Sequence, residues 1–397
     1  ALIVSIANDF LTQSTPERLE RNGIPESDRA EIALYRAEAR YLRALAYWHA
    51  LDLFRNVPLT TAISASFPTQ ATPQELFAFI ETELADIETI LPDPRQNEYG
   101  RADKGAVWML QAKLYLNAEA MTGEAKYTEC ITACRKVIDA GYSLDPSYQA
   151  LFMIDNDQSP EIIFALNADG KRTQSWGTTT FLVHAAIGGL MDPLQYGVND
   201  GWAGLRTTSA MLDKFPDLTG ATDKRGIFFT DGQNIEIEDI GVFEDGIAVP
   251  KYTNTNLAGD AGSDPTHVDT DYPMFRLADA WLMYAEAILR GGQGGSIDEA
   301  EGLINQLRER AYGDNSGQIT SAELTLDFIL DERVRELYWE ASRRIDLVRF
   351  GQFTETTVWP WKGGVREGRP TESFRTIFPI PASDLTANPN LIQNPGY

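Results

Sequence analysis

The residues of this sequence that most clearly indicate a role other than packing in the hydrophobic core are its tryptophans. The sequence contains eight, and four of them fall in stretches without helical periodicity: Trp176, Trp202, Trp359 and Trp361. A tryptophan in a loop leaves a large apolar ring in water unless that ring packs or binds something. A flat indole fits the apolar C–H face of a sugar ring, while polar side chains hold the sugar hydroxyls. These residues therefore indicate carbohydrate binding.

Trp176 and Trp202 form the first candidate pair, because the glycines beside them leave the rings uncovered. Tyr196, Asn199 and Asp200 lie shortly before Trp202 and add an aromatic ring, an amide and a carboxylate that can bind hydroxyl groups. We expect these five residues to bind glycan. The alternative is that the two indole rings fill the small core of an irregular subdomain.

Trp359 and Trp361 form a second candidate pair, separated by Pro360. In an extended chain, residues two apart point to the same side, so both rings would face one ligand. This pair ranks below the first one. The segment equally fits a brace for the last helix or a surface that faces a partner protein.

Signatures of catalysis and of cofactor binding are missing from the sequence. It has no G-x-S-x-G, P-loop, H-E-x-x-H or EF-hand motif. Its three histidines, His49, His184 and His267, are too scattered to predict a metal site. Cys130 and Cys134 are four apart on a predicted helix, where two small core residues are favoured over a metal or redox pair. We therefore expect no catalytic residue, no metal and no cofactor.

The composition narrows the choice of partner. The net charge of -24 argues against nucleic-acid binding, which needs basic surfaces, and favours a neutral glycan over an anionic one. The 397 residues, 43% of them hydrophobic, suffice for a large core. No run of about 18 apolar residues predicts a membrane span.

Helical patterns alternate with short loops through the first 141 residues, in the manner of tetratricopeptide helix pairs. Between residues 142 and 272 the periodicity fades, and short strand-like runs appear at 161–166 and 235–237. Helices return from residue 274. The sequence thus predicts a helical scaffold with an irregular, partly β insertion. The main predicted helices are 30–54, 73–91, one ending near 121, 126–140, 297–312 and 324–350.

The helix predicted from Ile329 to Gly351 has an unusual polar face. Glu332, Glu336 and Glu340 are four apart, which places like charges on neighbouring turns and weakens a helix that has no partners. We expect these carboxylates to pair with the arginines interleaved among them, although a solvated charged face is the alternative. Gly351 is expected to end the helix in a left-handed conformation. The interleaved arginines are Arg333, Arg335, Arg343 and Arg344.

Several stretches resemble the SusD/RagB family, the surface glycan-binding lipoproteins of Bacteroidetes. The C-terminal stretch from Phe378 to Tyr397 is the most specific of these. It includes Ile380-Pro381 and Gln393-Asn394-Pro395-Gly396-Tyr397. Four prolines in this stretch predict an extended tail that lies against the scaffold. The other similar stretches are Glu38-Ala39-Arg40 to Val57-Pro58-Leu59, Gly100 to Leu116, Arg276 to Ala287, Asp331-Glu332-Arg333, Arg335-Glu336-Leu337 and Arg344 to Gly351.

The resemblance implies a single SusD-like domain over residues 1–397, mainly α, with tetratricopeptide-like helix pairs in a superhelical scaffold. Its expected parts are N-terminal helices at 1–141, an irregular glycan-binding insertion at 142–272, scaffold helices at 273–351 and an extended tail at 352–397.

The resemblance also implies a function. A protein of this family captures oligosaccharides at the outer surface of the outer membrane, without catalysis, and delivers them to a SusC-like TonB-dependent transporter. The sequence opens at Ala1 without a signal peptide or a lipidation cysteine, so we expect a processed or trimmed chain whose lipid anchor lay in residues absent here. The alternatives are a protein-binding helical-repeat adaptor and an all-α glycoside hydrolase.

Overall fold

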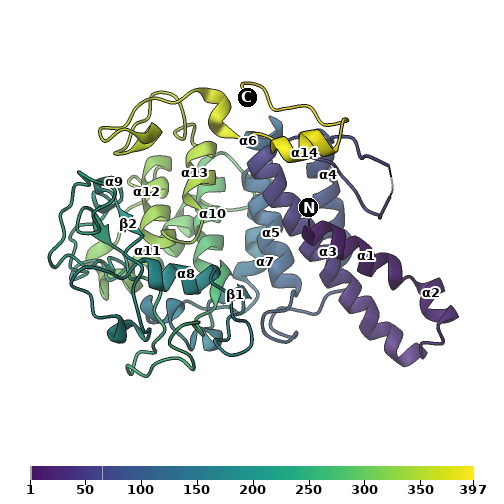
Figure 1. Cartoon of the computed structure of the whole chain (residues 1–397), viewed down its shortest axis with the longest axis horizontal. Helices are drawn as coiled ribbons and strands as arrows, with labels where there is room; N and C mark the ends of the chain where they lie inside the picture. Colours follow the sequence, from purple (N-terminus) through teal and green to yellow (C-terminus); the bar gives the residue numbers. More distant parts are fainter. Residues whose placement is uncertain (1, 65) are drawn as a thin grey trace.

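The computed structural model describes residues 2–64 and 66–397, and most of its regular structure is helical. The predicted mainly α fold class is confirmed. In the described part of the chain, the strands form two sheets of two strands each. Figure 1 shows two groups of helices side by side, the earlier in blue and the later in green, with irregular teal segments at the end of the later group.

The first group of helices packs largely in chain order. α3 packs against α1 and α4, and α5 contacts both α4 and α7. A capping box starts α4, since Thr72 and Glu75 each accept a hydrogen bond from the other's backbone N–H. The helices are α1 (Leu2–Gln13), α2 (Pro16–Arg21), α3 (Glu26–Phe54), α4 (Pro73–Glu88), α5 (Lys104–Leu116), α6 (Ala118–Thr122) and α7 (Tyr127–Ile138).

α10 (Leu277–Leu289) is the central helix of the molecule. Every residue from Leu277 to Ala287 is buried, which is typical of a helix covered on all sides. It packs against α7 of the first group and against α11 (Ile297–Tyr312) and α12 (Leu326–Leu337), and so joins the two groups. Among the described residues, no helix combines the length and the apolar character needed to cross a membrane.

The single helix predicted from Ile329 to Gly351 is wrong, because the chain leaves the helical path between α12 and α13 (Arg343–Arg349). Trp339, which was expected inside a helix, and Ala341 have φ values of 60° and 56°, a costly conformation for residues other than glycine. The break exposes the Tyr338 carbonyl, which accepts a hydrogen bond from Lys251 Nζ at 2.6 Å. Tertiary contacts therefore override the helical periodicity.

Gly351 follows α13 with a φ of 67°, as predicted for a left-handed C-terminal cap. The backbone N–H groups of Gly351 and Gln352 donate to carbonyls of the last helical turn at 3.0 and 2.7 Å.

Residues 142–272 contain short elements around a second hydrophobic core. The predicted strand at 161–166 is confirmed as β1, which pairs antiparallel with β4. The strand predicted at 235–237 is wrong; Asn234 instead makes an isolated bridge with Asp245. The elements are η1 (Gln149–Phe152), η2 (Asn156–Gln158), β1 (Ile162–Leu166), α8 (Thr178–Ala185), η3 (Pro193–Tyr196), β2 (Arg206–Thr207), α9 (Ser209–Leu212) and β3 (Ile247–Ala248), followed by β4 (Tyr272–Arg276).

The C-terminal segment, yellow in Figure 1, runs across one side of both helix groups. It lies against the scaffold as predicted: Phe378 N donates to Leu53 O at 2.7 Å, and Asn394 Nδ2 donates to Phe54 O at 3.0 Å. The fully extended tail is wrong, because α14 (Ala382–Ala387) forms directly after Pro381. Proline has a fixed φ and no N–H, but both are tolerated at a helix start, so a helix can begin just beyond Pro381. Two 3₁₀ turns, η5 (Lys362–Gly364) and η6 (Ser373–Thr376), precede it.

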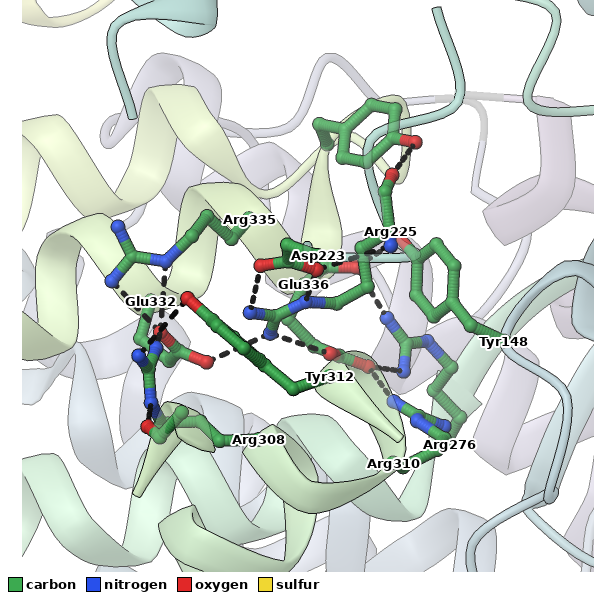
Figure 2. Close-up of polar contacts among 12 residues, drawn as sticks. Tyr148, Asp223, Arg225, Arg276, Arg308, Arg310, Tyr312, Glu332, Arg335 and Glu336 are labelled. Carbon is green, nitrogen blue, oxygen red and sulfur yellow. Dashed lines mark hydrogen bonds and ion pairs between the residues drawn. The ribbon is translucent and has the colours of Figure 1, made fainter. Parts of the chain in front are cut away.

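A buried network of carboxylates and arginines joins residues 142–272 to the scaffold (Figure 2). Arg225 donates to Glu332 at 2.7 Å and to Glu336 at 3.1 Å. Arg276, at the end of β4, donates to Glu336 at 2.6 Å and to Glu161 at 2.8 Å. All five side chains are at most 1% exposed.

The predicted pairing of the glutamates is confirmed, but most partners are not the predicted ones. Of the four interleaved arginines, Arg335 pairs with Glu332, at 2.8 Å. Arg333 instead lies on the opposite face of α12, where it binds Asp279 of α10 and Asp346 of α13. The main partners come from residues 142–272, from β4 and from α11, which all supply arginines to the glutamate face of α12. These partners are Arg225, Arg276, Arg308 and Arg310.

Charge pairing decides the protonation of this network. Burial opposes the charge on Glu336, but Arg310, Arg276 and Arg225 outweigh it and hold its pKa well below the ordinary value. Glu332 is likewise buried, and its arginine neighbours lower its pKa to about 2. A buried carboxylate is stable only when such partners compensate for its lost hydration.

Replacing Glu336 with Gln is expected to destabilise the protein by about 3–5 kcal/mol, because it leaves buried arginines without their counter-charge. Urea denaturation followed by circular dichroism measures the loss. The matched control is Glu372→Gln, which breaks a pair with Arg375 whose side chains are 63% and 52% exposed. We expect no measurable change there, and equal losses in the two variants would contradict the role assigned to burial.

Stability is also expected to fall in acid. The pKa of Glu332 is about 2 in the folded protein, below the value of about 4.3 of an unfolded glutamate, so its contribution is complete above pH 5. That contribution is lost as the pH falls from about 5 to 2. Denaturation midpoints across this range measure the effect, and a flat profile would show that the network contributes no pH-dependent stability.

Candidate glycan-binding site

Trp176 stands at the surface just before α8, and its ring is 63% exposed. Its centroid lies 6.0 Å from that of Trp202, with the ring planes 46° apart. The His267 ring contacts it edge-on at 4.8 Å. The structure thus brings together the two tryptophans of the first candidate pair, although 26 positions separate them in the sequence.

Trp202 is half-buried and rests on the α8 helix. Its ring is stacked on His184 with the centroids 4.8 Å apart and the planes at 17°. Phe181, one turn earlier on α8 and 43% exposed, lies 6.2 Å away on another side. We call the three rings of Trp176, Phe181 and Trp202 the aromatic platform. Sequence reasoning missed Phe181, although an aromatic residue among threonines at the start of a short helix was a usable signal.

The loop that carries Trp202 is fixed to α8 by its backbone. Trp202 N donates to His184 O at 2.8 Å, and Ala203 N donates to Ile187 O at 2.9 Å. Gly201 permits this approach, because a Cβ atom there would lie 2.5 Å from Ile187 O. Gly201 therefore permits close backbone contact, a role that was not predicted, and its expected role in uncovering the ring stays a prediction.

Polar groups lie at the edge of the platform. Asp200 is exposed, and its Oδ1 lies 2.7 Å from His184 Nδ1. Asn199 is also exposed, and its Nδ2 donates to Thr266 Oγ1 at 2.8 Å. Both residues remain accessible to a ligand.

Tyr196 lies more deeply than expected for a residue that binds a ligand. It packs half-buried against the second hydrophobic core, and this burial raises the pKa of its hydroxyl. Its carbonyl accepts a hydrogen bond from Asn254 N at 2.9 Å. These contacts support the segment that leads to Asn199 and Asp200.

The second candidate pair has a different environment. Trp361 is half-buried and its Nε1 donates to Ile237 O at 3.0 Å, so its ring ties the C-terminal segment to residues 142–272. Trp359 packs near Phe353 and under Lys362 Nζ, which lies 4.4 Å from its ring centroid. These contacts hold the segment against residues 142–272, and both the brace for the last helix and the role in glycan binding stay predictions.

A polar hollow of about 560 Å³ lies beside the loop that leads to Trp176. Asp169 and Lys171 of that loop line it, together with Tyr99 and Asn167. In residues 2–64 and 66–397, no group of three or more His, Cys, Asp or Glu side chains is placed to hold a metal ion. Cys130 and Cys134 are both buried in the main core, as predicted, with their sulfur atoms 4.0 Å apart.

The fold and the site together define a class of protein, namely a helical scaffold that presents a surface aromatic platform on an irregular insertion. Comparisons with known proteins identify its family. Residues 239–397 match the model of the SusD family. The starch-binding protein SusD of Bacteroides thetaiotaomicron is 37% identical, over 93% of this chain and 74% of that protein. The chain belongs to the SusD family.

Further relatives are more distant. The SusD-like protein P2 of Formosa agariphila is 26% identical, over 96% of this chain and 77% of that protein. Surface glycan-binding protein A of Bacteroides thetaiotaomicron, solved with laminarihexaose, has a TM-score of 0.77 at 23% identity, over 98% of this chain and 83% of that one. The same-named protein of Bacteroides uniformis gives 0.76 at 22% identity, with 98% and 82% covered. These two structures share the fold.

Replacing Gly201 with Ala is expected to push the Trp202 loop away from α8 and to cost about 1–3 kcal/mol, because the new methyl group would overlap a backbone oxygen. Thermal unfolding and tryptophan emission measure the change. Gly177→Ala is the control, since a Cβ atom there would meet only Ser175 Oγ, at 3.5 Å. A Gly201→Ala variant as stable as the control would contradict the close packing of this loop.

Proposed function

We propose that this protein captures oligosaccharides at the cell surface without transforming them. The observation that carries this proposal is the aromatic platform, in which an exposed Trp176 lies next to a Trp202 fixed to α8. Indole rings bind the apolar faces of sugars, and the exposed side chains of Asn199 and Asp200 are of the kind that binds sugar hydroxyls. Relatives support it, since one is named a starch-binding protein and one was solved with laminarihexaose.

Preorganisation makes the platform suitable for capture. Backbone hydrogen bonds hold the Trp202 loop on α8, so little conformational entropy is lost when a glycan binds. Each stacking contact contributes about 1 kcal/mol, which gives the modest affinity that a protein needs when it must release its ligand again. The net charge of -24 favours a neutral glycan.

Transfer of the glycan and attachment to the membrane are further parts of the proposal. We infer a SusC-like TonB-dependent transporter as the protein partner and a lipid anchor in the outer membrane, both supported by membership of the SusD family. In this arrangement residues 142–272 form the glycan-binding insertion, and the helices at 1–141 and 273–351 form its frame.

The platform is tested by removing its rings one at a time. Trp176→Ala and Trp202→Ala are each expected to weaken binding about fivefold or more, because each loses a stacking contact of about 1 kcal/mol. Affinity gel electrophoresis against a panel of neutral polysaccharides measures this effect. Phe67→Ala is the matched control, because Phe67 is a similarly exposed ring (58%) on the scaffold between α3 and α4.

Unchanged affinity in folded Trp176→Ala and Trp202→Ala variants would move the site elsewhere, and Trp359→Ala then tests the second pair. Release of short sugars from a polysaccharide would overturn the non-catalytic assignment. Binding of no glycan on an array would favour a protein-binding adaptor.

A further inference from the structure

His184 lies directly beneath Trp202 and is completely buried. Its Nδ1 is 2.7 Å from the Asp200 carboxylate and 3.0 Å from the Asp200 carbonyl oxygen. Its Nε2 is 2.9 Å from the carbonyl oxygen of Thr266. Both ring nitrogens therefore face oxygen atoms at hydrogen-bond distance.

These oxygens can only accept hydrogen bonds. Two are backbone carbonyls, and the third belongs to a carboxylate whose side chain is 61% exposed to water. A neutral imidazole carries one N–H and one lone pair, so in either tautomer one nitrogen would direct its lone pair at an oxygen lone pair. Only the imidazolium, with both nitrogens protonated, can donate to both sides.

His184 also holds Trp202 in two ways. Its backbone carbonyl accepts the hydrogen bond from Trp202 N, and its ring lies parallel to the indole at 4.8 Å. A cation over the face of an indole is attracted to it. A charge on His184 would thus hold both the loop that carries Asp200 and the Trp202 ring.

We propose that His184 is a positioning residue held as an imidazolium, and that the aromatic platform is formed at acidic and neutral pH and loosens as the pH rises. The proton is bound at low pH and released at high pH, so the loss occurs on the alkaline side. Release leaves one nitrogen facing an acceptor without a hydrogen atom between them. The link to affinity rests on the proposed glycan-binding function.

The other titratable groups around His184 come from two segments. The loop above it contributes Asp200, and the segment that carries Thr266 contributes Asp264 and His267. Asp264 accepts from the backbone N–H groups of Thr266 and His267 at 2.8 and 2.9 Å. The His267 ring contacts Trp176.

Nuclear magnetic resonance of the whole chain tests the protonation state without any ligand. The sequence has three histidines, so ¹⁵N-histidine labelling gives few signals, which His49→Asn and His267→Asn variants assign by difference. We expect both ring nitrogens of His184 to carry protons at pH 7. A His184 ring with a single N–H at pH 6–7 would overturn the proposal.

The effect on the platform is read from tryptophan emission of the ligand-free protein. Raising the pH is expected to shift the emission to longer wavelength with the same midpoint as the His184 signals, and Trp202→Phe should lack this shift. An emission that does not follow His184 would overturn the positioning role. This readout needs no glycan, so it stands apart from the proposed function.

Affinity is then measured with laminarihexaose and maltoheptaose at pH 6.5 and pH 9. We expect binding about fivefold or more weaker at pH 9. In Asp200→Asn the pH dependence should weaken whatever the affinity, because an amide can donate to the neutral ring while the backbone carbonyl of residue 200 still faces it. It should persist in His267→Gln. Its loss in His267→Gln, or an undiminished pH dependence in Asp200→Asn, would overturn the proposal. Binding of neither sugar at any pH, with the ligand-free results as expected, would count against the glycan assignment alone.

Discussion

The buried pairing of Glu332 and Glu336 with arginines from distant segments is the interaction on which the rest of the structure depends. Arg225 lies within residues 142–272 and Arg276 ends β4, yet both reach the same face of α12. An isolated charge at these depths would cost several kcal/mol, so the carboxylates and arginines must arrive together. This requirement fixes the position of residues 142–272 on the helices, although these residues have little regular structure. The aromatic platform, which belongs to these residues, is held in place with them.

Much of the scaffold was predictable, because apolar periodicity, caps and glycines act locally. Thr72 and Gly351 mark helix ends as expected. The wrong predictions of secondary structure have a common cause, because contacts between segments far apart in the sequence determine the structure there. Trp339 leaves the helix where Lys251 binds the neighbouring carbonyl, and α14 forms where the tail meets the scaffold. No local pattern around Arg225 indicates that two of its partners, Glu332 and Glu336, lie more than 100 positions away.

The site was predictable in kind and only partly in detail. Loop tryptophans beside glycines pointed to Trp176 and Trp202, which the structure brings together. The roles of His184 and Phe181 were not predicted, because they depend on contact between α8 and Trp202, which lies 17 positions after the end of that helix. Trp361 shows the opposite limit: residue type suggested a ligand, whereas its indole N–H is already bonded to Ile237.

The C-terminal segment has a consequence for the life of the nascent chain. The carbonyl of Phe54 accepts a hydrogen bond from Asn394, which lies 340 residues later in the sequence. Asn390 donates to the carbonyl of Phe67, 323 residues before it. At ribosomal speeds of roughly 5–20 residues per second, the end of α3 stays uncovered for about 20–70 s of synthesis. A chain cut short before residue 390 lacks both of these hydrogen bonds, so this side of α3 is completed only by residues far along the sequence.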